Sequence, residues 1–230
     1  MLEERVWCIW VGNQEMSEQR KRCFDMIQQT IGAPVTLVTD ANLHEYVLKD
    51  HPFHEAYPYL SSVMKCDYVR AYCMNQYGGG YTDIKQTFAS WRPYFQDLRA
   101  NEDKWICGYK EPDVGRVALQ VPENKELQER LFAKWEQLIG VCSCICKPRT
   151  PFTEEWMANI HSVLDRMLPQ LKERPANHPR DAFQHWIHGS YSTYPLYWAQ
   201  ICSCIVHPLC LKYSERILNT LPPPLFEKYM

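Results

Sequence analysis

The chain has 230 residues, of which 46% are hydrophobic and 23% charged, and its formal net charge is −2. This composition is typical of a globular protein and excludes a disordered or membrane-embedded chain, and the near-neutral charge argues against a general affinity for nucleic-acid phosphates. The length suits one α/β core, so a single domain over residues 1–230 is predicted.

The N-terminal residues do not resemble an export signal. Glu3 and Glu4 stand where a signal peptide carries positive charge, and no later stretch approaches the length of a membrane span. The eleven cysteines are an odd number and are interpreted as reduced thiols, many of them buried. We therefore expect a cytoplasmic protein without a membrane span.

The first predicted elements alternate between strand and helix. Val6–Val11 is an apolar run that ends at Gly12 and predicts a buried strand opening into a loop. Ser17 is the predicted N-cap of a helix that ends before Pro34, and Val35–Val38 predicts a second strand. This order favours a parallel sheet with right-handed crossovers.

The next predicted helix leads into a glycine run. It starts at Ser61 or Ser62 and continues to about Gln76, before three consecutive glycines at 78–80. A short strand is predicted over Tyr81–Ile84, directly after the glycines.

Further elements are predicted from apolar patterns in the second half. Two strands are expected over Trp105–Tyr109 and Val117–Val121. A helix with buried positions from Leu127 to Leu138 follows, and another begins after Pro151 and is expected to stop at Pro169. The aromatic-rich residues 180–200 are compatible either with a sugar-stacking wall or with an aromatic edge of the core.

Residues 65–85, KCDYVRAYCMNQYGGGYTDIK, hold the most informative set of side chains. Asp67 and Arg70 are three apart on a predicted helix and share a face, while Asp83 and Lys85 are alternate residues of a predicted strand. Carboxylates accept hydrogen bonds from sugar hydroxyls, and cations or a metal offset a diphosphate as a glycosidic bond breaks. Together these residues match a nucleotide-sugar site, although each alone suits a solvated helix and a glycine turn.

The order and spacing of this set resemble the signature D-x-x-R-x-x-x-L-x-x-Y-G-G-x-Y-x-D-x-D. It belongs to the DXD-containing sugar-binding glycosyltransferases, which include Och1-like mannosyltransferases, capsular polysaccharide synthesis proteins and glucosylating clostridial toxins. Met74 replaces the leucine and Gly80 fills the variable site, and the matching residues are Asp67, Arg70, Tyr77, Gly78, Gly79, Tyr81 and Asp83. The segment HWIHGSY at 185–191 is similar to the family's C-terminal H-h-x-x-G-S-W.

The resemblance implies a fold and an activity. The fold is GT-A, a single Rossmann-like α/β domain with a mostly parallel central sheet flanked by helices. The activity is transfer of a sugar from a nucleotide-sugar donor, expected to be UDP-linked, to a hydroxyl of a glycan or glycoprotein. By analogy with the relatives, the reaction is expected to retain the anomeric configuration.

The resemblance also implies site residues. Trp10, Val11 and Gly12 are expected at the base and ribose, and His185, His188 and Ser190 are expected to close over the diphosphate. The other expected donor-binding residues are Asp67, Arg70, Gly80, Tyr81, Asp83 and Lys85. The predicted catalytic residues are Asp83, Lys85 and His188, and Asp181 is an alternative to His188 as a base.

One residue departs from the signature. Lys85 stands where the family has the second aspartate of DXD, which is normally the direct metal ligand. A lysine does not bind a cation, but its ammonium can neutralise a diphosphate. Asp83 alone can hold a hydrated Mn²⁺ or Mg²⁺ with help from nucleotide phosphates. The sequence leaves metal dependence open.

Other classes of protein compete with this interpretation. A dinucleotide-binding dehydrogenase is disfavoured because the glycines follow a helix instead of opening one. The lysine at position 85 also allows a nucleotide-sugar-binding protein without catalysis. A zinc-binding interaction module lacks the usual C-x-x-C pairs, and its ligands would come from Cys142, Cys144, Cys146, Cys202, Cys204, His207 and Cys210.

The sequence also predicts how the Asp67–Arg70 pair contributes to stability. An exposed pair of this spacing is worth roughly 0.2–0.5 kcal/mol, so replacing either residue by alanine is expected to leave Tm nearly unchanged while transfer falls sharply.

Overall fold

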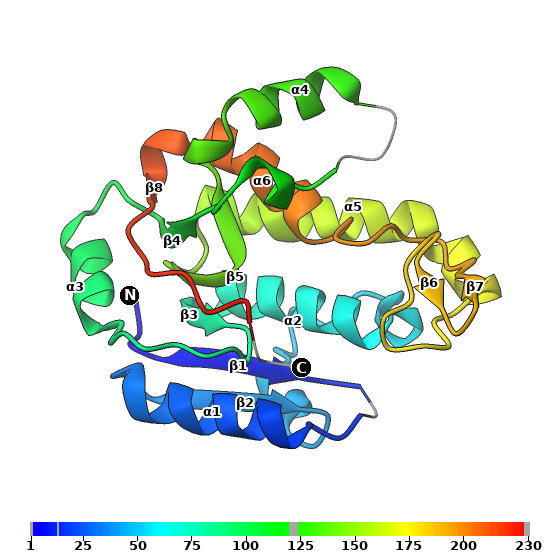
Figure 1. The fold of residues 1–230 in the computed structure, drawn as a ribbon, viewed down its shortest axis with the longest axis horizontal. Helices are drawn as coiled ribbons and strands as arrows, with labels where there is room; N and C mark the ends of the chain where they lie inside the picture. The colour runs from blue at the N-terminus through cyan, green and yellow to red at the C-terminus, as the bar shows by residue number, and fades with distance from the viewer. Residues whose placement is uncertain (1, 13, 120–123, 228–230) are drawn as a thin grey trace.

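The fold is organised around a six-stranded sheet in the order β2-β1-β3-β5-β4-β8 (Figure 1). The structure is a computed structural model that describes residues 2–12, 14–119 and 124–227. Only β5 runs antiparallel to its neighbours, and the other pairs are parallel, which confirms the predicted mostly parallel α/β sheet. The strands are β1 Val6–Trp10, β2 Val35–Thr39, β3 Gly79–Thr82, β4 Ile106–Lys110, β5 Ile139–Cys146 and β8 Ile217–Leu218.

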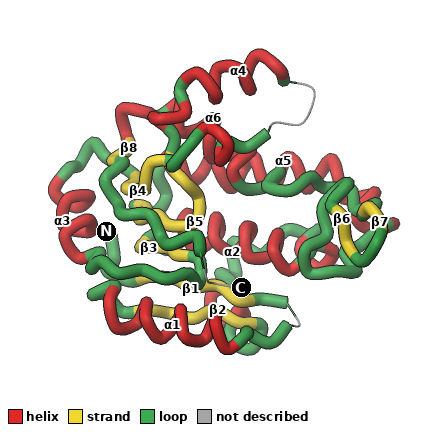
Figure 2. The backbone as a smooth tube through the Cα atoms, viewed as in Figure 1, coloured by secondary structure: helices red, strands yellow, loops and turns green. Residues whose placement is uncertain are grey.

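Helices cover both faces of this sheet (Figure 2). Alternate residues of β1 enter different cores because successive side chains of a strand point to opposite faces. Val6 and Cys8 pack with α1 (Glu18–Thr30) and α3 (Arg92–Ala100). Trp7 and Ile9 belong to the core formed with α2 (Ser62–Gln76), α5 (Pro151–Glu173) and α6 (Ser203–Lys212). Among the described residues, α4 (Lys125–Ala133) packs against α6.

Side-chain caps mark the starts of α1 and α5, and one of these caps, Ser17, was predicted. Ser17 accepts a hydrogen bond from the Arg20 amide at the start of α1, which satisfies one of the free N–H groups there. The α5 helix begins with a capping box formed by Thr150 and Thr153. Local capping therefore accounts for these boundaries.

The predicted stop of α5 at Pro169 is wrong, because the helix continues to Glu173. An interior proline leaves the carbonyl four residues earlier, that of Asp165, without its helical donor. Asp165 and Pro169 are both exposed, so water can satisfy that carbonyl and the final turn persists.

Two predictions around residues 114–138 are also wrong. Residues 117–119 form no strand, and the rest of the predicted strand, 120 and 121, lies outside the described residues. The helix predicted to include Leu138 ends at Ala133, and a separate 3₁₀ turn covers Trp135–Gln137. The β5 strand, which was not predicted, then begins at Ile139.

The glycine run positions the third strand. Gly78 and Gly79 have φ of 66° and 91°, and a Cβ at Gly79 would lie 2.7 Å from the Arg5 carbonyl oxygen. This conformation and this close approach require glycine. The strand therefore starts two residues earlier than predicted, and Asp83 and Lys85 lie in the bend after it instead of on it.

A short hairpin stands apart from the main sheet. It consists of β6 (Trp186–Ile187) and β7 (Ser190–Tyr191), paired antiparallel. His188 and Gly189 form the turn with φ of 47° and 87°, which is typical of a type I′ hairpin turn. The glycine of the HWIHGSY segment is therefore a turn residue.

All eleven cysteines lie in the described part of the chain as free thiols, in agreement with the expected reduced state. Among the described helices, none is long and apolar enough to cross a membrane.

Candidate functional site

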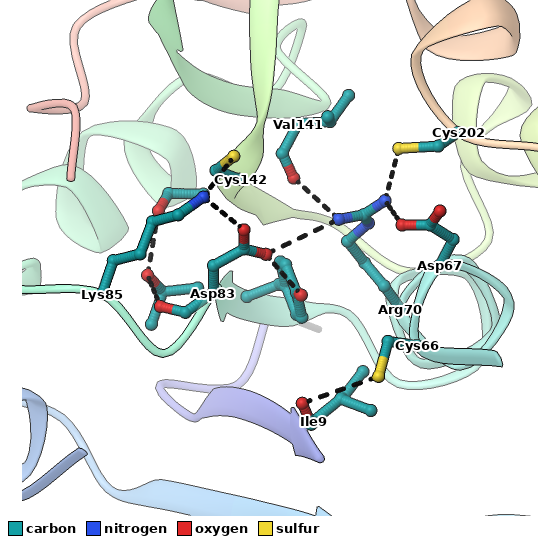
Figure 3. Close-up of polar contacts among 12 residues, drawn as sticks. Ile9, Cys66, Asp67, Arg70, Asp83, Lys85, Val141, Cys142 and Cys202 are labelled. Atoms are coloured by element: carbon teal, nitrogen blue, oxygen red, sulfur yellow. Dashed lines mark hydrogen bonds and ion pairs between the residues drawn. The ribbon is translucent and has the colours of Figure 1, made fainter. Parts of the chain in front are cut away.

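Four ionisable side chains meet at the carboxyl ends of β1 and β3, and we call them the charge cluster: Asp67, Arg70, Asp83 and Lys85 (Figure 3). Arg70 Nη2 donates to Asp67 Oδ1 at 2.6 Å, and Lys85 Nζ donates to Asp83 Oδ2 at 2.7 Å. The two pairs are joined where Arg70 Nη1 lies 3.8 Å from Asp83 Oδ1. The structure thus brings together the four residues that the sequence singled out.

The charge cluster is mostly buried. The exposed fractions of the side chains are 4% for Arg70, 8% for Lys85 and 13% for Asp67, against 26% for Asp83. The expectation of an exposed Asp67–Arg70 pair is therefore wrong. The helix that carries this pair lies between the sheet and α5, so ten of its residues are buried. Asp83 is the member of the cluster most open to a ligand.

The charges set the protonation of the carboxylates. Burial alone would raise the pKa of Asp83, but Lys85 and Arg70 outweigh it and hold that pKa at about 2. Burial raises the pKa of Asp67 above its ordinary value, more than Arg70 lowers it. Asp83 is accordingly the more firmly ionised carboxylate of the two.

The ammonium of Lys85 is likewise held in its charged form. Burial would lower the pKa of Lys85, but the neighbouring Asp83 carboxylate raises it above its ordinary value. Lys85 Nζ also lies 3.1 Å from Cys142 Sγ. A fixed positive charge therefore lies beside the partly exposed Asp83 carboxylate at neutral pH.

Tyr81 holds the cluster against the sheet. Its hydroxyl donates to Asp83 Oδ1 at 2.7 Å, and the Arg70 guanidinium lies 5.0 Å from the centre of its ring. Tyr81 is buried on β3 opposite Cys144 of β5. Gly80, also predicted at the donor, is buried on the other face, where a Cβ would meet Trp91 at 3.0 Å. Its observed role is close packing.

Two contacts of Arg70 in the cluster were missed by sequence reasoning. Cys202 Sγ lies 2.6 Å from Arg70 Nη2, and the Val141 carbonyl accepts from Arg70 Nη1 at 3.1 Å. The sequence predicted Cys202 as one of many buried thiols, and it did not predict β5, so no local signal connected either segment with Arg70. Arg70 Nε is buried without a hydrogen-bond partner among the described atoms.

The end of β1, where the base and ribose site is predicted, lies beside the start of α2. Gly12 has φ of 102°, and a Cβ there would lie 2.1 Å from Ser62 Oγ, so only glycine fits. Its amide donates to Asp40 Oδ2 at 2.7 Å, at the end of β2. Val11 is buried in the core, whereas Trp10 is partly exposed.

Arg20 links this edge to the cluster, and sequence reasoning did not single it out. Its guanidinium lies 5.9 Å from the Trp10 ring centre and donates from Nη1 to the carbonyl of Ile84, the residue between Asp83 and Lys85. Only the folded arrangement of α1 reveals this link, since Arg20 belongs to no recognisable motif.

The hairpin residues have local contacts. The His185 ring lies 5.3 Å from that of Trp198, the His188 ring 5.2 Å from that of His178, and Ser190 donates to the Ile187 carbonyl. Figure 1 shows the hairpin beside the C-terminal end of α5, away from β3 and β5. The structure therefore does not bring His185, His188 and Ser190 to the charge cluster, and their role at a diphosphate stays a prediction.

Asp181, the alternative base, stabilises the loop before the hairpin. Its Oδ2 accepts from the amides of Asn177 and His178 at 2.7 Å each, and its Oδ1 accepts from Ser192 Oγ at 3.0 Å. Because this buried carboxylate accepts three hydrogen bonds, two of them from its own loop, the observed role of Asp181 is to cap that loop.

The cluster does not fit a divalent metal held at Asp83. Oδ1 accepts from Tyr81 and faces Arg70, and Oδ2 accepts from Lys85. A divalent ion on this carboxylate would lie beside a fixed ammonium, and that repulsion is costly in a partly buried site.

The cysteines and His207 also lack the geometry that the zinc hypothesis needs. Among the described residues, no three His, Cys, Asp or Glu side chains are grouped to hold a metal.

Comparisons with known proteins give distant fold-level similarity. No protein-family model and no curated protein matches the chain. The structure titled PaToxG glycosyltransferase is 13% identical with a TM-score of 0.43, over 76% of this chain and 66% of its own. The apo structure of the bifunctional glycosyltransferase WbbM is 12% identical with a TM-score of 0.43, over 97% and 46%. Similarity this low carries no argument about function.

Proposed function

We propose that the chain is a glycosyltransferase that moves a sugar from a nucleotide-sugar donor, UDP-linked, to a hydroxyl of a glycan or glycoprotein. The observation that carries this proposal is the charge cluster at the carboxyl ends of β1 and β3. The sheet order changes direction at β1, between β2 and β3, and ligands of open α/β sheets bind at such points.

The cluster supplies the groups that sugar transfer needs. Asp83 is ionised and partly exposed, so its carboxylate can accept hydrogen bonds from donor-sugar hydroxyls. Arg70 and Asp67 fix its position from the helix side. Lys85 provides positive charge where negative charge grows on the departing diphosphate.

We infer that the ammonium of Lys85 takes the part that a metal has in the DXD families. The support is electrostatic, because Lys85 already neutralises the carboxylate that would otherwise bind the ion. The reaction then runs with protein charge alone at Asp83.

Binding of donors tests the proposal directly. Thermal unfolding is to be followed with UDP-glucose, UDP-N-acetylglucosamine, GDP-mannose and NAD, because a ligand specific for the folded state raises Tm. A UDP-sugar should stabilise the protein, and Asp83→Ala should remove that shift. Stabilisation by NAD with no response to any nucleotide sugar would overturn the assignment.

A second candidate function is nucleotide-sugar binding without transfer. The observation that favours it is the 2.7 Å pairing of Asp83 with Lys85, which occupies one oxygen of the central carboxylate. Donor hydrolysis separates the two functions. An enzyme releases UDP from its preferred donor over time in an Asp83-dependent manner, whereas a binding protein returns the donor intact.

A further inference from the structure

A groove separate from the charge cluster opens along α5. It has a volume of about 440 Å³, within the usual range for ligand sites, and we call it the α5 groove. One wall comes from the last turns of α5 and its C-cap. The other comes from Phe183, just before the hairpin, and from the segment between the hairpin and α6, which runs alongside α5 (Figure 2). Its lining residues are Arg166, Met167, Gln170, Arg174, Phe183, Pro195, Tyr197 and Gln200.

The lining has the chemistry of a site for an anionic sugar. Arg166 and Arg174 contribute two guanidinium groups, and no aspartate or glutamate belongs to the lining. Guanidinium forks bind carboxylate and phosphate oxygens in a bidentate manner. The two positive charges therefore favour a ligand that carries negative charge.

The opposite wall suits a sugar ring. Phe183 and Tyr197 pack edge to face with ring centres 5.0 Å apart, and both are partly exposed. Aromatic rings present an apolar face, and the Tyr hydroxyl adds a polar tip. Gln170 offers both a donor and an acceptor for sugar hydroxyls on the α5 wall.

The groove is connected to the charge cluster through a short segment. Gln200 lines the groove, and its Oε1 accepts from the Tyr197 amide. Two residues further on, Cys202 contacts Arg70 at 2.6 Å. Two residues span at most about 7 Å, so a ligand in the groove lies close to the segment that touches the cluster.

We propose that the α5 groove binds an anionic oligosaccharide, one carrying carboxylate or phosphate groups, as the acceptor side of the reaction. The binding claim stands on the groove itself, while the acceptor role rests on the proposed function.

Calorimetric titration without any nucleotide sugar tests the binding claim. The probes are trigalacturonate for carboxylates, glucose 6-phosphate for phosphate, and maltotriose as an uncharged sugar of matched length. The test variant is Arg166→Gln/Arg174→Gln. The control is Lys172→Gln, which removes an α5 charge that pairs with Glu55 and does not line the groove.

We expect at least one anionic probe to bind at least roughly tenfold more tightly than maltotriose. The double variant should weaken the affinity for that anionic probe by a similar factor, since each hydrogen bond between a guanidinium and an anionic group contributes strongly to the binding free energy. Lys172→Gln should bind the probes with wild-type affinity. Tyr197→Ala should lower the affinity for the sugar that the wild type binds, without unfolding the protein. Whichever anion binds identifies the charged group.

The inference is overturned if neither anionic probe binds, if maltotriose binds equally well, or if Lys172→Gln has the effect of the double variant. These outcomes are independent of the donor site, because the titration contains no donor. Conversely, the double variant should keep the Tm shift produced by UDP-sugars, so failure of the proposed function and failure of the groove are distinguishable.

Discussion

Lys85 Nζ donates to Asp83 Oδ2 at 2.7 Å, which pairs the two side chains that the sequence aligns with the two aspartate positions of a DXD-like pattern. The lysine reaches the carboxylate from the bend after β3, with its own amide hydrogen-bonded to the Asp83 carbonyl at 2.7 Å. The pair is thus built into one tight backbone turn, and each residue depends on the other for its position and its charge.

Lys85→Ala is expected to change the metal response of the proposed transfer reaction. The wild type should keep activity in EDTA, whereas the variant should become dependent on added Mn²⁺, because the partly exposed Asp83 carboxylate loses its cation. Release of UDP from the preferred donor, with and without EDTA, measures this.

Lys85→Arg is the matched control, since it retains a positive charge and should retain chelator resistance at reduced rate. If EDTA abolishes wild-type activity, Lys85 does not substitute for a metal. Asp83→Ala should be inactive under every metal condition, and normal turnover in that variant would remove the cluster from the mechanism.

Arg70→Ala is expected to destabilise the protein strongly, in contrast to the estimate made for an exposed pair. It leaves Asp67 buried without its cation, and breaking a buried pair in this way costs about 3–5 kcal/mol. For a chain of this length the loss corresponds to a fall in Tm of roughly 6–20 °C. Differential scanning calorimetry provides the measurement.

Lys21→Ala breaks the exposed Lys21–Glu18 pair, which has the same i,i+3 spacing, and serves as the control with little expected change in Tm. Equal shifts for the two variants would show that burial of Arg70 has no energetic effect.

Asp83 should stabilise the fold in a pH-dependent manner. Its folded-state pKa of about 2 lies below the ordinary 3.8, so its contribution is complete above pH 3.8 and is lost as pH falls towards 2. Urea unfolding of the wild type and Asp83→Asn should show a large stability gap at neutral pH that closes across this interval. A gap that stays constant would contradict the assigned pKa.

His161 should make the protein less stable in mild acid. Burial, and then the neighbouring His54, lower the pKa of His161 below 6.5, so the folded state prefers the neutral ring. Its stabilisation is complete above pH 6.5 and is lost as pH falls from that value towards the lower folded-state pKa. Urea midpoints at about pH 7.5 and about pH 5.5 measure the loss.

The variant His161→Gln isolates this effect, because an amide oxygen can still accept from the Tyr68 hydroxyl, which lies 3.1 Å from His161 Nε2. The difference between the two pH values should shrink in the variant. An unchanged difference would assign the pH dependence to other groups.

His188→Asn tests the predicted role of the hairpin. Asparagine tolerates the positive φ that His188 has in the turn, so the hairpin should stay folded. If the hairpin closes over a bound diphosphate, the variant should weaken UDP-sugar affinity and lower turnover. Unchanged values for both would place His188 outside the site.

The N-terminal half of the fold and the charge cluster were largely readable from the sequence. Ser17 and the helical spacing predicted α1, and the spacing of Asp67 and Arg70 predicted that they act together. Asp83 and Lys85 were expected to lie on the same face of a strand. Their side chains do contact each other, but because the chain bends after β3 and not because they lie on a strand.

The antiparallel strand β5 shows why other parts of the fold and site could not be predicted from the sequence. Its sequence IGVCSCIC is buried and rich in small residues, so it lacks the alternation that marks a half-exposed strand. Its contacts with Arg70 and Lys85 join residues far apart in the chain. Burial of Arg70 likewise follows from how α5 packs over α2, which no local pattern reports.

The order of the sheet has a consequence for synthesis on the ribosome. The strands β1, β2 and β3 are complete early, but β4 gains its outer neighbour only when Ile217 and Leu218 have emerged. Until then β4 presents an open edge with unpaired backbone groups, which is the kind of surface that pairs with other nascent chains. Closing that edge is the last step in assembling the sheet, and it depends on two residues.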